Sequence, residues 1–195
     1  MKIYSIDVED KYQTIVPVDY NSEIHDMLSF NGTSKAEVWK TIEFIVDDPL
    51  DSIGNFYSLS YGTAFACDRV AVEAMSEFWN SAGELLPISL KGKELYIFNV
   101  TNCIDVLDTE KSLFDFYKDG SRGRILEYVF NEFGYNETSI FKIPETSKIQ
   151  ILTYTGLSSY SNEGNFYNTY RKNGLKGLTF TEVYSDEEVG SVGSG

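Results

Sequence analysis

The stretch between residues 67 and 112 constrains the fold of this chain more than any other. Apolar residues within it recur at helical spacing and form one stripe, namely Ala71, Met75, Phe78, Trp79 and Ala82. Asp68 or Cys67 can serve as the N-cap of such a helix. Gly83 stands where a left-handed residue commonly ends one. The sequence therefore predicts a helix over residues 68–82.

Two short apolar segments follow this helix, Leu85–Leu90 and Leu95–Val100. Their length and their composition are typical of strands. Lys91, Gly92 and Lys93 separate them, which is a tight-turn signal, so we expect an antiparallel hairpin. Residues 103–107 are expected either to continue this sheet or to flank it.

The first fifty residues give weaker signals. Residues 2–8 are rich in β-branched and aromatic side chains and predict a strand. Residues 9–38 show no sustained period and predict loops with short elements. Residues 39–46 fit either a strand or one helical turn. This segment is stopped before Pro49, whose ring disfavours helix at the residue before it.

The second half of the chain predicts strands at residues 139–143, 148–154 and 178–184, and a helix at about 163–172. Residues 118–124 form a polar turn, and residues 125–130 fit a strand better than a helix. Ser112 is expected to cap a short helix over residues 113–117. Asp105 and Asp108 are expected to bond nearby backbone N–H groups in a turn.

Together these elements predict one α+β domain over residues 1–188, with a mixed or antiparallel sheet flanked by two to four helices. Residues 189–195 predict a flexible tail. A chain of 195 residues with 42% hydrophobic residues can bury a core without disulfides or metals. We expect Cys67 and Cys103 to be free thiols in a reducing compartment.

A cytoplasmic location is expected for this chain. Asp7, Glu9 and Asp10 interrupt the region where a signal peptide needs an apolar run. No stretch approaches the roughly 18 apolar residues of a membrane span.

The charge balance limits the partners. The chain has 30 acidic and 16 basic residues, with a net charge of −14. Such a field repels nucleic acid and anionic membranes, so neither is an expected partner. It attracts a basic protein and speeds the encounter with it. Solubility alone is the alternative explanation of the same charge.

No catalytic, cofactor or metal motif stands out. His25 is the single histidine, and no G-x-S-x-G sequence accompanies it. Lys91-Gly92-Lys93 lacks the upstream glycine spacing and the hydroxyl residue of a phosphate-binding loop. The acidic clusters lack the spacing of a calcium loop. The sequence therefore predicts a protein that is not an enzyme and that holds no cofactor and no metal.

Most of the chain, at about residues 55–184, resembles a family of immunity proteins from bacterial polymorphic-toxin systems. This is the family-eleven type, formerly catalogued as a domain of unknown function. The resemblance implies an α+β fold, no enzymatic activity, no cofactor, and binding of a toxin that differs between members. The segments that carry it are Gly83–Pro87, Leu95–Val100, Cys103–Asp108 with Ser112, Ile140–Pro144 and Gly174–Phe180.

The resemblance and the charge together predict an inhibitor of a basic toxin domain, for which a nuclease is one candidate class. Charge clustering selects the acidic residues expected to contact the toxin, which are Asp7, Glu9, Asp10, Asp47, Asp48 and Asp51. Two alternatives stay open. One is a small-molecule hydrolase that uses His25 with two carboxylates, and the other is a regulatory module that binds a protein other than a toxin. The sequence leaves the toxin's identity and the oligomeric state undefined.

Overall fold

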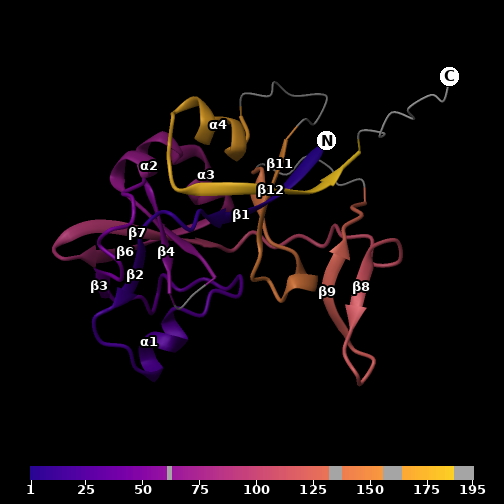
Figure 1. The fold of residues 1–195 in the computed structure, drawn as a ribbon, viewed down its shortest axis with the longest axis horizontal. Helices are drawn as coiled ribbons and strands as arrows, with labels where there is room; N and C mark the ends of the chain where they lie inside the picture. The colour runs from indigo at the N-terminus through magenta and orange to yellow at the C-terminus, as the bar shows by residue number, and fades with distance from the viewer. Residues whose placement is uncertain (61–62, 132–137, 156–163, 187–195) are drawn as a thin grey trace.

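A closed barrel of six strands and an open sheet of four strands form the body of the molecule (Figure 1). The computed structural model describes residues 1–60, 63–131, 138–155 and 164–186. Neighbouring strands of the barrel are, in order, β2 (Thr14–Pro17), β3 (Glu43–Val46), β6 (Gly83–Leu90), β7 (Lys93–Val100), β5 (Phe65–Cys67) and β4 (Phe56–Leu59). The open sheet has the order β10 (Ile140–Phe141), β11 (Ile151–Thr155), β1 (Lys2–Val8) and β12 (Leu178–Ser185).

The remaining elements surround these two sheets. Strands β8 (Leu113–Phe116) and β9 (Arg122–Glu127) form a separate hairpin that lies at the right of Figure 1, away from the barrel. The helices are α1 (Ser22–Met27), α2 (Arg69–Ala74), α3 (Ser76–Ala82) and α4 (Phe166–Lys172), with a 3₁₀ turn at Pro144–Thr146. The predicted α+β class is confirmed. The closure of six strands into a barrel is new.

Side-chain alternation fills the barrel. In β6, Leu86 and Ile88 point into the barrel, and Leu95 and Ile97 of β7 meet them there. Phe98 and Val100 of β7 point outward, into a second core beneath the helices. Strand β7 therefore serves two cores, which explains why both of its faces are apolar.

The hairpin between residues 83 and 100 is confirmed, with a two-residue loop. Lys91 and Gly92 have φ angles of 51° and 82°, so both central residues are left-handed. This is the pattern of a type I′ turn, whose twist matches that of the flanking strands. The pairing continues from Leu90 opposite Lys93 as far as Gly83 opposite Val100.

The helix predicted over residues 68–82 is two short helices, α2 and α3, which meet at Met75. Asp68 is the N-cap, and its carboxylate accepts the N–H of Ala71 at 2.9 Å. The Nε1–H of Trp79 donates to the carbonyl of Val72 at 2.8 Å. In a continuous helix that carbonyl would serve the residue four positions later, so the indole supports the break. All five residues of the predicted stripe are buried.

Gly83 is not the left-handed cap that the sequence predicted. Its φ is 174°, which is extended backbone, and it begins β6. A Cβ at this position would lie 2.0 Å from the carbonyl oxygen of Asn99. Glycine is therefore required by close approach of the partner strand rather than by backbone conformation.

Several other predictions are also corrected. The helix expected after Ser112 is strand β8, because the Ser112 hydroxyl joins the backbone of residue 129 across the hairpin. Residues 103–107 do not continue the barrel sheet, and their isolated bridges join Lys142 and Phe130 outside it. The predicted strands near residues 140 and 150 are shorter, at β10 and β11. Residue 163 and the expected tail at 189–195 lie outside the described residues.

Lys142 joins the open sheet to the barrel. Its side chain is fully buried, and its Nζ donates to the carbonyl of Phe30 at 3.0 Å. The hydroxyl of Thr63 donates to the same carbonyl. Burial lowers the pKa of Lys142 from 10.5 to about 8, because removal from water disfavours the charged ammonium group. Burial of this ammonium group in its charged form lowers the free energy of unfolding at neutral pH.

The helices in the described part of the chain are short. The longest, α3 and α4, have seven residues each. None of them is long and apolar enough to cross a bilayer.

We expect Gly83→Ala to lower the free energy of unfolding by about 3 kcal/mol, because its Cβ would overlap the carbonyl of Asn99. Urea denaturation measures this loss. Gly164→Ala is the matched control, since nothing lies within 4 Å of a Cβ there. Equal effects of the two substitutions would contradict the close approach of β6 and β7.

The buried Lys142 predicts that the free energy of unfolding depends on pH. The folded pKa of about 8 lies below the unfolded value, so the unfolded state binds more protons between pH 8 and about 10.5. The wild-type free energy of unfolding should therefore rise across this window, by about 3 kcal/mol relative to Lys142→Met. Lys118→Met, at an exposed lysine, is the control and should leave the rise intact. A pH-independent difference between wild type and Lys142→Met would contradict the lowered pKa.

Candidate partner-binding surface

Backbone hydrogen bonds bring two acidic loops together at one end of the barrel. The N–H of Ser52 donates to Lys11 at 2.9 Å, and the N–H of Gln13 donates back to Ser52 at 3.1 Å. The N–H of Asp47 donates to Thr14. Residues 9–12 and 47–53, which are far apart in sequence, therefore form one continuous area. We call these two segments the acidic loop surface.

The loop between β3 and β4 has a defined local structure. The carboxylate of Asp48 accepts the N–H of Leu50 at 2.8 Å, which is an Asx turn. The N–H of Asp51 donates to the carbonyl of Asp48. Pro49 sets the turn between them. This arrangement holds the acidic side chains on a fixed backbone and leaves Asp47 exposed.

Two aliphatic side chains project from the same loop. Leu50 is 92% exposed and Ile53 is 72% exposed. Exposed apolar side chains ringed by charge are typical of protein interfaces. Neither residue was among the predicted contacts, although apolar residues within the acidic run Asp47–Ile53 were a signal that could have revealed them.

An apolar strip on the outer face of the barrel continues this surface. Val16 of β2 pairs directly with Ile45 of β3, and both point outward. Val18 follows at the end of β2, with its N–H on the carbonyl of Glu43. Ile45 and Val18 are exposed. The strip leads from the middle of the strands to Asp47.

The structure brings most of the predicted acidic residues together. Asp10, Asp47 and Asp48 are exposed on the acidic loop surface, and Glu9 and Asp51 are partly buried there. Glu9 also forms an ion pair with Lys11 at 2.6 Å. Asp7 differs, since it lies on β1 and accepts a hydrogen bond from Ser5. It lines a cleft of about 370 Å³ in which no described residue of the 47–53 loop takes part.

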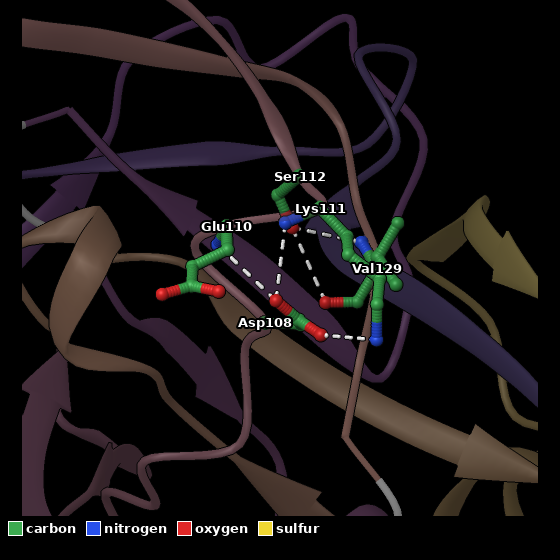
Figure 2. Close-up of polar contacts among 5 residues, drawn as sticks. All are labelled: Asp108, Glu110, Lys111, Ser112 and Val129. Carbon is green, nitrogen blue, oxygen red and sulfur yellow. Dashed lines mark hydrogen bonds and ion pairs between the residues drawn. The ribbon is translucent and has the colours of Figure 1, made fainter.

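Asp108 has a structural role in its turn (Figure 2). Its carboxylate accepts the N–H groups of Glu110 and Lys111, each at 3.1 Å, and the ammonium group of Lys111 at 2.8 Å. The Lys111 side chain and these N–H groups lower the pKa of Asp108. The Ser112 hydroxyl donates to the carbonyl of Val129 and accepts its N–H. The predicted turn role of Asp108 is confirmed.

His25 lies at the rim of an apolar cleft of about 410 Å³. Its Nδ1 is 2.7 Å from the hydroxyl of Tyr20, and the two rings meet edge to face. A hydrolase would need an activated nucleophile beside His25, and the contact shown at its Nδ1 is the phenol hydroxyl of Tyr20. Cys67 is fully buried, which raises the pKa of its thiol, and Cys103 is partly buried.

The described residues contain no group of three or more histidine, cysteine, aspartate or glutamate side chains that could hold a metal ion. No protein-family model matches the chain, and no curated protein matches it either. The family resemblance therefore stays a prediction, and the surfaces described above carry the functional argument.

The Asp108 turn predicts a stability that depends on pH. The folded pKa lies below the unfolded value, so the stabilisation is present at neutral pH and is lost as pH falls through the folded pKa. Asp108→Asn should therefore be less stable than wild type at pH 7, and the difference should shrink below about pH 4. Urea denaturation at several pH values measures this. Asp105→Asn, at an exposed aspartate, is the control. A difference that stays constant down to pH 2 would contradict the ionic turn.

Proposed function

We propose that this protein is a cytoplasmic immunity protein that neutralises a basic toxin domain by stoichiometric binding. One observation carries the proposal, which is the meeting of two acidic loops around exposed Leu50 and Ile53. The net charge of −14 and the resemblance to polymorphic-toxin immunity proteins support it. A nuclease is one candidate class, because its phosphate-binding groove is basic.

Charged and apolar residues of the acidic loop surface would contribute to binding in different ways. The exposed carboxylates attract a basic partner over a distance of about one Debye length and speed association. Leu50 and Ile53 would then enter apolar depressions of the partner and slow dissociation. Neither group of residues alone would give both properties.

The two alternatives predict different behaviour. A hydrolase would use the cleft beside His25 and would not need the acidic loop surface. A regulatory module would use the same surface for a basic protein that is not a toxin. The identity of the bound partner separates this second alternative from immunity.

The test is co-purification with the product of the gene directly upstream, followed by affinity measurement across a salt series. We expect tight 1:1 binding that weakens as salt rises. Asp10→Lys with Asp47→Lys should weaken it by about 10- to 100-fold, because both carboxylates are exposed and face the proposed partner.

Asp105→Lys with Glu127→Lys is the matched control, since it changes the net charge equally at exposed positions outside the acidic loop surface. An equal loss of affinity in both variants would contradict binding through the acidic loop surface. Tight binding that ignores salt would contradict the electrostatic mechanism. Absence of binding by the wild type would contradict immunity against that gene product.

A further inference from the structure

A groove of about 820 Å³ runs between α1 and the segment that precedes β3. Glu23 and Asp26 line one wall, from a single face of α1. Lys35, Glu37, Trp39 and Lys40 line the other. The groove is open to solvent. Helix α1, which forms one of its walls, lies on the opposite side of the barrel from α2 and α3 (Figure 1).

Two lysines tie the walls together. The ammonium group of Lys40 pairs with Glu23 at 2.8 Å, and that of Lys35 donates to the backbone carbonyl of Asp26 at 2.8 Å. The pairing with Lys40 lowers the pKa of Glu23. Both ammonium groups are thus bonded to α1 across the groove. The carboxylates of Asp26 and Glu37 accept no hydrogen bond from the described residues.

Trp39 supplies an aromatic surface of fixed orientation. Its Nε1–H donates to the carbonyl of Pro87 at 2.9 Å, and its ring packs against Phe30. The polar edge of the indole is therefore satisfied within the protein. An indole face beside carboxylates is suited to a cation.

We propose that this groove binds an extended segment of a basic partner by taking an arginine side chain onto Trp39, between the carboxylates of Asp26 and Glu37. A guanidinium group stacks on an aromatic ring and bonds carboxylates in a plane, whereas an ammonium group does neither as well. Charge complementarity selects this occupant, since three carboxylates and two ammonium groups line the groove, and only the carboxylate of Glu23 is paired with one of these lysines, Lys40. The assignment of the segment to a toxin rests on the proposed function. The preference of the groove for an arginine side chain does not.

The groove is separate from the acidic loop surface. The two lie at different ends of β2, since residues 9–12 precede this strand and α1 follows it. A basic partner could therefore engage the barrel at two places, which would raise its affinity without any new contact at either one.

The test uses the blocked tripeptide Arg-Arg-Arg as the probe, titrated into the full chain by calorimetry at low ionic strength. We expect binding that Asp26→Asn with Glu37→Gln weakens at least about tenfold. The matched control is Asp105→Asn with Glu127→Gln, which removes the same charge at exposed positions outside both surfaces and should change the affinity by less than about twofold. Blocked Lys-Lys-Lys should bind more weakly than the arginine probe.

A second measurement does not depend on variants that fold. The Nε1–H resonance of Trp39 should shift as the arginine probe is added to the wild type, while that of buried Trp79 stays in place. An equal loss of affinity for the arginine probe in both variant pairs, or an unmoved Trp39 resonance, would overturn the proposed arginine site. Failure to capture the toxin with intact tripeptide binding would contradict the proposed function alone.

Discussion

Closure of the barrel depends on two short parallel ladders. Strand β2 pairs with β4 through Thr14 and Ile15, and β3 pairs with β6 through Glu43 and Phe44. These ladders insert the β2–β3 pair between strands that come much later in the chain. Because β2 and β3 are antiparallel, the residues before β2 and those after β3 emerge at the same end. The acidic loop surface therefore depends on the antiparallel pairing of β2 with β3 within this barrel.

The parts of the fold that the sequence predicted are those set by local rules. The type I′ turn at Lys91 and Gly92, the cap at Asp68 and the stripe that includes Trp79 each depend on neighbours within a few residues. The barrel depends on pairings between strands about 40 residues apart, and three of these strands, β2, β3 and β4, have only four residues each, over which no period can be measured. The break at Met75 likewise depends on an indole hydrogen bond that sequence spacing cannot show.

The sequence predicted the acidic character of the candidate site but not the arrangement of its loops in space. The acidic clusters around Asp10 and Asp47 were visible as composition, and their meeting required the hydrogen bonds of Ser52. Leu50 would ordinarily be assigned to a core, because apolar residues of this size are usually buried. Its exposure follows from the turn at Asp48, which points the next residues away from the barrel.

Acidic residues in this chain fall into two kinds that a sequence does not distinguish. Asp108 directs its carboxylate to its own backbone and to Lys111, so its charge is already used within the fold. Asp47 is exposed, and among the described residues its bond to Thr14 is made by its backbone N–H rather than by its carboxylate. A carboxylate of the second kind loses no internal hydrogen bond when it meets a cation, so the net gain on binding is larger. The proposed binding of a basic protein by the acidic loop surface therefore depends on which carboxylates the fold leaves exposed rather than on the net charge of −14.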